Sequence, residues 1–171
     1  MRSPLPSFVA IDFETADHGP DSACAVGLVM VREGRITGRE RHLIRPPRRD
    51  FVFTYLHGIA WEHVSKKPSF AELWPRLAPR LQGARFLAAH NAPFDRSVLQ
   101  ACCAGAGLEP PPQPFVCTVR LARKAWDIFP TKLPNVCEFL GIRLKHHEAL
   151  SDAEACARIV LAAHKEGAMI R

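Results

Sequence analysis

Hydrophobic residues follow two different patterns along the chain, and the pattern changes after residue 50. In the first part, apolar runs bounded by turn residues are typical of strands. They predict strands at Phe8–Glu14, Ala23–Arg32 and Ile36–Ile44, with a turn at Glu33 and Gly34. Strands that follow one another so closely predict an antiparallel meander.

The second part alternates helix patterns with short strand patterns. Ser69 and Glu72 match a capping box, and apolar residues at helical spacing continue to Leu81; Pro75 and Pro79 are expected to shorten or bend this helix. The other expected elements are strands at Arg85–Ala89 and Phe115–Cys117 and helices at about Pro93–Gly105, Val119–Trp126, Pro134–Leu140 and Leu150–Lys165. This order predicts an α/β fold with a mixed five-stranded sheet, antiparallel strands first and parallel strands after, flanked by helices.

Composition places the chain among ordinary globular proteins. Its 171 residues, 47% hydrophobic and 23% charged, fit one domain over residues 1–171. No apolar run reaches the roughly 18–20 residues that span a bilayer, and Met1–Ser7 lacks the apolar core of a secretory signal. We therefore expect a cytoplasmic protein without a membrane partner. The six cysteines have no C-x-x-C spacing, which favours free thiols over zinc or disulfides.

Positive charge is in excess, with 23 Lys and Arg against 17 Asp and Glu and a net charge of +6. Such an excess is typical of proteins that bind polyanions, although many basic proteins bind none. Basic side chains can follow phosphates, and a solvated basic surface is the alternative for each of them. The candidates for phosphate contacts are Arg45, Arg48, Arg49, Arg120, Arg123 and Lys124.

Two carboxylates lie at the end of the first predicted strand. Asp12 and Glu14 are two residues apart, so their side chains leave the same face of the strand. The apolar run Phe8–Ile11 before them predicts a buried element, in which adjacent carboxylates are costly unless a cation binds them. The alternative is a strand end that returns to solvent.

Further acidic residues follow later elements. Asp95 falls in the first turn of the helix after a buried strand, where the alternative is compensation of the helix dipole. His147 and Asp152 are five residues apart, which on an unbroken helix separates their side chains by roughly 140°. They converge only if the helix begins between them, and Ser151 with Glu154 resembles a capping box near such a start.

The three motifs together resemble those of the DEDDh exonucleases, a family of ribonuclease H-like fold that includes ribonuclease T and the proofreading epsilon subunit of bacterial DNA polymerase III. They stand in the family's order: D-x-E at Asp12, H-N-x-x-F-D at His90–Asp95 and H-x-x-x-x-D at His147. The resemblance covers nearly the whole chain, from Phe8 to about Ala163.

The resemblance implies a role for each of five residues. Asp12, Glu14 and Asp152 would be ligands of two divalent cations, with Asp12 bridging them. Asp95 would act mostly through a coordinated water, and His147 would be the general base. Mg²⁺ is the expected cation, because it prefers carboxylate and water oxygens, and Mn²⁺ should substitute for it. The one tyrosine lies far from the last motif, which supports the histidine branch of the family.

The expected activity is 3′→5′ hydrolysis at the 3′ ends of single-stranded nucleic acid, with DNA favoured over RNA and nucleoside 5′-monophosphates as products. An exoribonuclease that trims RNA 3′ ends and a non-catalytic nucleic-acid-binding module of the same fold are the alternatives. The chain ends at Arg171, without a long tail like the one that tethers the epsilon subunit to its polymerase. We expect a stand-alone exonuclease or a weak association with a polymerase.

Side chains beside the motifs are expected to hold the substrate or to support the site. The segment His57–Ile59 resembles the family's H-G-I segment, and bases can stack on apolar side chains. The family spacing selects His147 as the base over His146, and adjacent residues in a loop are expected to point to different sides. His146 is therefore expected to be a structural or surface residue whose removal costs little. The expected substrate contacts are Phe13, Thr15, His57, Gly58, Ile59, His90, Asn91 and Phe94.

Overall fold

The chain folds around a five-stranded mixed sheet with the strand order β3-β2-β1-β4-β5. A computed structural model describes residues 4–170, so residues 1–3 of the N-terminal segment, on which the secretory signal was judged, and Arg171 lie outside the described residues. β1 pairs antiparallel with β2 and β2 antiparallel with β3, whereas β4 pairs parallel with β1 and with β5. This confirms the predicted α/β fold. The strands are β1 Phe8–Thr15, β2 Ala23–Arg32, β3 Arg35–Leu43, β4 Phe86–Ala89 and β5 Phe115–Cys117.

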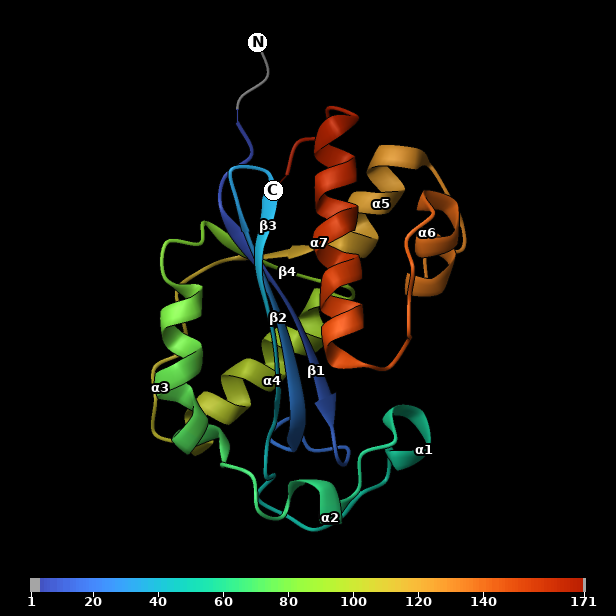
Figure 1. Ribbon diagram of the computed structural model, residues 1–171. Coiled ribbons are helices and arrows are strands. Elements are labelled where there is room, and N and C mark those ends of the chain that lie inside the picture. Colours follow the sequence, from blue (N-terminus) through green and yellow to red (C-terminus); the bar gives the residue numbers. More distant parts are fainter. Residues whose placement is uncertain (1–3, 171) are drawn as a thin grey trace.

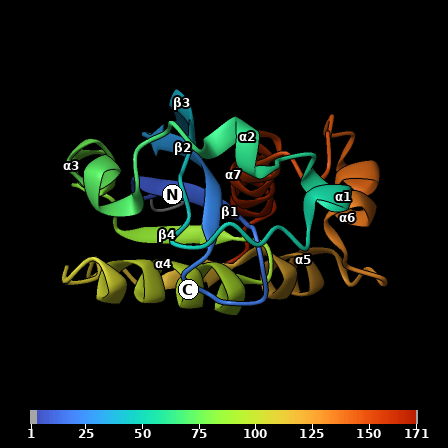
Figure 2. The same cartoon turned by 90° about the horizontal axis from the view of Figure 1, so that it is seen from below.

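Helices cover both faces of the sheet (Figure 1). One face carries α3 and α4, and α7 lies on the other face together with α5 and α6. The short helices α1 and α2 were not predicted; the view from below shows α1 on the side that carries α6 and α7 (Figure 2). The helices are α1 Thr54–His57, α2 Trp61–Val64, α3 Phe70–Leu81, α4 Ala92–Gly105, α5 Thr118–Trp126, α6 Leu133–Leu140 and α7 Ala149–Lys165.

The alternation of side chains along β1 decides where its carboxylates lie. The odd-numbered residues within Val9–Phe13 join the apolar core shared with α3 and α4. Phe8 and Ala10 point the other way and join the core under α7. Asp12 and Glu14 continue this second series, so they emerge on the α7 face where the apolar core ends.

A glycine in β2 allows α7 to begin close to these carboxylates. Gly27 is the partner of Asp12 in the β1–β2 register. A Cβ at Gly27 would overlap the backbone carbonyl of Ala149, the first residue of α7. The missing side chain lets the helix start rest directly on the sheet, which brings Asp152 in its first turn next to Asp12.

The structure bears on two expectations about helices. Pro75 and Pro79 do not shorten α3, which is continuous; both are exposed and one turn apart, so the carbonyls that lose a hydrogen bond face solvent. The capping box at the start of α7 is also misplaced. The N-cap is Glu148, whose side chain accepts the N–H of Ser151 at 2.9 Å. Ser151 lies inside the first turn, and its hydroxyl accepts the N–H of Lys145 at 2.8 Å.

Two features bear on the classes of protein considered above. Along residues 4–170, no helix combines the length and the apolar character that crossing a bilayer requires. All six cysteines lie among the described residues and are free of disulfides; five are buried and Cys117 is half-buried.

Candidate active site

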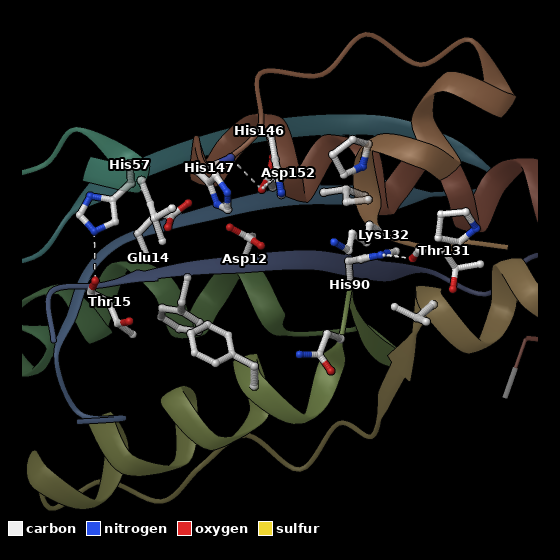
Figure 3. A pocket seen from close by; sticks show the side chains of 18 of the residues that line it. Asp12, Glu14, Thr15, His57, His90, Thr131, Lys132, His146, His147 and Asp152 are labelled. Atoms are coloured by element: carbon white, nitrogen blue, oxygen red, sulfur yellow. Dashed lines mark hydrogen bonds and ion pairs between the residues drawn. The ribbon is translucent and has the colours of Figure 1, made fainter. Parts of the chain in front are cut away.

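A pocket of about 870 Å³ opens at the carboxyl end of β1 (Figure 3). Its walls come from the end of β1, from α1, from the start of α4, from α5 with the α5–α6 connection, and from the residues around the start of α7. The pocket thus lies where the carboxyl ends of β1 and β4 meet the starts of α4 and α7. Ligands commonly bind at this edge in open α/β sheets.

Three carboxylates converge at the floor of this pocket. Asp12, Glu14 and Asp152 each offer one carboxylate oxygen, and these oxygens lie within 4.8 Å of one another. Oδ2 of Asp152 accepts two hydrogen bonds, but its Oδ1 is buried and has no hydrogen-bond partner among the described residues. A buried oxygen without a donor is costly unless a cation takes that place.

Asp95 is more deeply buried than the other three carboxylates. It lies in the first turn of α4, as expected, is 1% exposed, and does not line the pocket. Its Oδ1 accepts the backbone N–H of Phe13 at 2.9 Å, between the two acidic residues of β1. Asp95 therefore contributes negative charge to the site, while its carboxylate also fixes the end of β1.

Burial makes this cluster electrostatically unfavourable without a cation. It raises the pKa of Asp12 well above its usual range, and the charges of Asp95 and Asp152 add to the effect. Burial, then the charges of Asp152 and Glu148, raise the pKa of Glu14 to about 7, although Arg41 opposes them. A divalent cation would favour the ionised form of every member, and an all-oxygen set suits Mg²⁺. The residues therefore fit the expected metal.

The two adjacent histidines lie on the same side of the chain, so the expectation that they point apart is wrong. His147 has a left-handed backbone, with φ of 64°, which turns its ring back over its neighbour. The rings of His146 and His147 stack with centroids 3.8 Å apart and planes at 25°. Both rings line the pocket, and the backbone N–H of His147 donates to Oδ2 of Asp152 at 3.1 Å. His147 and Asp152 thus converge because α7 begins between them.

His57 connects α1 to the end of β1. Its Nε2 donates to the carbonyl of Thr15 at 3.0 Å, while its Nδ1 accepts the N–H of Ile59 at 3.0 Å (Figure 3). Burial lowers the pKa of this imidazole, so it stays neutral. Gly58 ends α1 with a φ of 73°, and Ile59 is buried in the core. Of the three, only His57 lines the pocket; neither Gly58 nor Ile59 reaches it.

His90 likewise uses both ring nitrogens within the protein. Nδ1 lies 2.8 Å from the hydroxyl of Thr118, and Nε2 lies 2.9 Å from the carbonyl of Thr131. Burial lowers the pKa of His90 to about 4, so the ring is neutral and holds the α5–α6 connection against β4. Asn91, the N-cap of α4, and the exposed ring of Phe94 line the pocket beside it. Phe13 and Thr15 line the pocket from β1.

The sequence of this folded unit matches a known family. Residues 9–160, which include all the residues of the carboxylate cluster, match the model of the RNase T exonucleases. The chain belongs to this exonuclease family. Its membership agrees with the motif order and with the place of the carboxylates at the end of the central strand.

Several relatives within the exonuclease family are identified by sequence. DNA polymerase III PolC-type of Thermotoga petrophila is 31% identical over 160 residues, and exodeoxyribonuclease 10 of Escherichia coli K12 is 30% identical over 145 residues. DNA polymerase III subunit epsilon of Pasteurella multocida is 31% identical over 144 residues. The match to the PolC-type polymerase covers 91% of this chain but 12% of the polymerase. The matches to exodeoxyribonuclease 10 and to the epsilon subunit each cover 80% of this chain, and 59% and 56% of those relatives. The chain thus spans a small part of the first relative and little more than half of the others.

Solved structures show the same exonuclease fold. Exonuclease X in complex with 5′ overhanging duplex DNA has a TM-score of 0.76 and 26% identity, with 95% of each chain covered. The nuclease domain of 3′hExo, a DEDDh family member bound to rAMP, has a TM-score of 0.84 at 20% identity and covers 100% of this chain and 98% of that one. At this identity the second match supports the fold alone.

Most of the basic residues predicted to contact phosphates are paired with carboxylates or lie outside the pocket. Arg48 is held by both Asp17 and Asp21, at 3.0 and 2.7 Å, and Arg45 pairs with Glu72 at 3.2 Å. These two are neutralised within the exonuclease fold. Arg49, Arg120 and Lys124 do not line the pocket, and Arg49 lies over the ring of Trp61.

Helix α5 and the N-cap of α6 supply the pocket with positive charge, of which the sequence analysis named Arg123 and missed Lys132. Arg123 lines the pocket, and its Nε donates to the hydroxyl of Thr131 at 2.8 Å. Lys132, the exposed N-cap of α6, lies on the same wall (Figure 3). Leu56 of α1 and Phe129 add apolar surface to the opening. A lone lysine before a helix carries no sequence signal of its position beside a pocket, and neither does a leucine in a short loop helix.

Proposed function

We propose that this chain is a divalent-metal-dependent 3′→5′ exonuclease that hydrolyses single-stranded DNA to nucleoside 5′-monophosphates. The observation that carries the proposal is the convergence of three pocket carboxylates, one of which, Asp152, has a buried oxygen without a partner among the described residues, with an imidazole lining the same pocket. Membership in the exonuclease family supports hydrolysis of a terminal phosphodiester.

The carboxylates would form the metal site. Asp12, Glu14 and Asp152 would hold two Mg²⁺ ions, and the buried Asp95 would add negative charge that favours cation binding. When bound, such a pair of ions neutralises charge on the phosphoryl oxygens and on the attacking and leaving oxygens. The protein's own contribution is to keep three carboxylates together in one pocket, with the end of β1 fixed by the buried Asp95.

His147 would act as the general base. Burial, followed by the charge of His146, lowers its pKa, so the ring is neutral near pH 7. A neutral imidazole can accept the proton of the attacking water at a ring nitrogen. Its position on the pocket wall, above Asp12 and beside Asp152, supports this assignment (Figure 3).

The substrate strand would enter between apolar and basic walls. Phe94 and Leu56 are exposed and offer apolar surface on which terminal bases can stack, without sequence preference. Arg123 and Lys132 on the opposite wall would attract the backbone phosphates. DNA is preferred over RNA in this proposal because relatives at 30–31% identity are named for DNA polymerase III and exodeoxyribonuclease.

A substrate comparison tests this proposal. Labelled single-stranded DNA, duplex DNA and RNA of one sequence are digested side by side with Mg²⁺, with Asp12→Ala as the inactive control. Single-stranded DNA should be degraded fastest, and the control should degrade none of the three. Faster degradation of RNA than of DNA would reverse the assigned substrate, and equal activity of Asp12→Ala would reject the site.

A further inference from the structure

His146 makes two contacts inside the candidate active site (Figure 3). Its Nδ1 lies 2.9 Å from Oδ2 of Asp152, and its ring stacks face to face on the ring of His147. Because a carboxylate only accepts hydrogen bonds, the hydrogen of this bond belongs to Nδ1 of His146. One side chain therefore touches both the carboxylate with the orphaned oxygen and the candidate base.

The hydrogen bond to Asp152 fixes the rotation of its carboxylate. The last torsion of an aspartate side chain is soft, so contacts must select one orientation. Both contacts of this carboxylate reach the same oxygen, Oδ2: one from His146 and one from the backbone N–H of His147. With Oδ2 held in this way, Oδ1 is the oxygen left without a hydrogen-bond partner among the described residues and available to a cation. Within the part of the chain that the structure describes, His146 is the one side chain that makes this contact.

The stacking contact orients the imidazole of His147. This residue lies before the N-cap of α7, on a turn with positive φ rather than on a regular element. Within residues 4–170, no hydrogen bond holds its ring, whereas those of His57 and His90 are each held at both nitrogens. The ring of His146, 3.8 Å away, is the aromatic surface that limits its rotation. A catalytic group must be held close to one geometry to act efficiently.

We propose that His146 is a positioning residue of this site: its Nδ1 orients Asp152 for cation binding, and its ring orients His147 for proton transfer. The proposal rests on the proposed function and replaces the expectation that removal of His146 costs little. It assigns no contact with the substrate to His146. His146 thus has two separable roles, as a hydrogen-bond donor and as a stacking surface.

Three substitutions separate the two roles. His146→Asn keeps a donor near the place of Nδ1 and loses the ring. His146→Phe keeps a stacking ring and loses the donor, and His146→Ala loses both. His42→Ala is the matched control, because His42 also contacts a carboxylate, that of Glu40 at 3.0 Å, but lies on β3 outside the pocket.

Mn²⁺ affinity, measured by electron paramagnetic resonance without nucleic acid, reports on Asp152. Loss of a partner that orients a metal ligand typically weakens metal binding about 10- to 100-fold, so His146→Phe and His146→Ala should show this loss. His146→Asn should restore the affinity towards that of the wild type. The turnover number at saturating Mn²⁺ reports on His147. It should fall about 10- to 100-fold in His146→Asn and His146→Ala with an unchanged Michaelis constant, and stay high in His146→Phe.

The opposite outcomes overturn the inference. If all three variants match His42→Ala in Mn²⁺ affinity and in turnover, His146 positions neither group. If Asn and Phe both behave like Ala in both measurements, the donor and the ring do not act separately, and the two assigned roles are wrong. A wild-type protein that binds Mn²⁺ but degrades no nucleic acid would reject the proposed function, and the Mn²⁺ affinities would still test the contact with Asp152.

Discussion

At the scale of single residues, Glu14 has a strongly raised pKa in the candidate site. Its pKa in the folded, metal-free protein is raised to about 7 by burial and by Asp152 and Glu148. In an unfolded chain the same group titrates near about 4.3. The folded state therefore binds this proton more tightly, so the contribution of Glu14 to stability is fully present below about pH 4 and is lost as pH rises through about 7.

The first prediction uses Glu14→Gln, which cannot ionise. In EDTA, the wild-type melting temperature should fall between pH 6 and pH 8 by more than that of the variant, because only the wild type must ionise a buried carboxyl group. The variant should also lose most exonuclease activity in Mg²⁺. Equal falls in melting temperature for both proteins, or near-wild-type turnover of the variant at saturating Mg²⁺, would place Glu14 outside the cation site.

The second prediction concerns His147. His147→Ala should lower the turnover number about 10²–10⁴-fold, the usual contribution of a positioned general base. Affinity for an oligonucleotide, measured by fluorescence anisotropy, should be largely kept, because the carboxylates and basic residues remain. The acidic limb of the wild-type rate profile should lie below the usual histidine range, since burial lowers the pKa of His147, and should be absent from the residual activity. A variant with wild-type turnover would contradict the assignment.

At the scale of elements, the site depends on how α7 meets the sheet. Its first residue, Ala149, lies against Gly27 of β2, and Gly27 stands opposite Asp12 on β1. The distance between Asp152 and Asp12 is therefore set by a contact between a helix start and a bare stretch of strand. A side chain at this contact has no free space, because the atoms it would meet belong to the backbone.

The third prediction follows from this contact. Gly27→Ala should displace the start of α7, destabilise the protein by about 1–3 kcal/mol, and lower turnover more than substrate affinity. Gly38→Ala is the control, because a Cβ there would meet only the flexible end of Met30. Thermal unfolding and steady-state kinetics measure both effects. Equal behaviour of the two variants would show that the Gly27 contact does not position α7.

Sequence patterns predicted the elements because burial follows from local periodicity. The run at Phe8–Glu14 and the helical spacing up to Leu81 each describe one element and its buried face, and the structure has both. The cap of α7 was misplaced because Ser151 is a preferred N-cap residue and Glu148 is not, so the sequence pattern favours the serine although the helix begins three residues earlier.

Side-chain positions in loops could not be predicted from the sequence, because they depend on single backbone torsions. The rule that neighbours point apart holds for extended chain, and the positive φ of His147 removes its basis. The place of Lys132 on the pocket wall depends on the α5–α6 connection held by His90. Asp12, Glu14 and Asp152 nevertheless lie in one cluster, since the motif spacing fixes which strand end or helix start each occupies.

At the scale of the whole molecule, only some of the basic side chains are free to contact a polyanion. The net charge is +6, yet basic residues such as Arg48 and Arg39 are engaged by nearby carboxylates. The pocket presents Arg123 and Lys132 on one wall. A polyanion should therefore be attracted by the overall charge and contacted by a few local cations.

The fourth prediction is a salt dependence of binding with a local contribution from Lys132. Affinity for single-stranded DNA should fall as salt rises, because basic residues displace counterions from the phosphates. Lys132→Ala should reduce the slope of log affinity against log salt by about 1, whereas Lys66→Ala, an exposed lysine outside the pocket, should leave it unchanged. A binding constant that does not change between low and physiological salt would argue against a nucleic-acid substrate.

The central claim is that the chain removes nucleotides from the 3′ end with the help of divalent cations. The most direct measurement follows single-stranded DNA labelled at its 5′ end in Mg²⁺, in EDTA, and in EDTA with excess Mg²⁺ or Mn²⁺ added back. We expect a descending ladder of labelled products that EDTA abolishes and either cation restores, with unlabelled nucleoside 5′-monophosphates released. Full activity in EDTA, or label released as mononucleotide from the outset, would contradict the account.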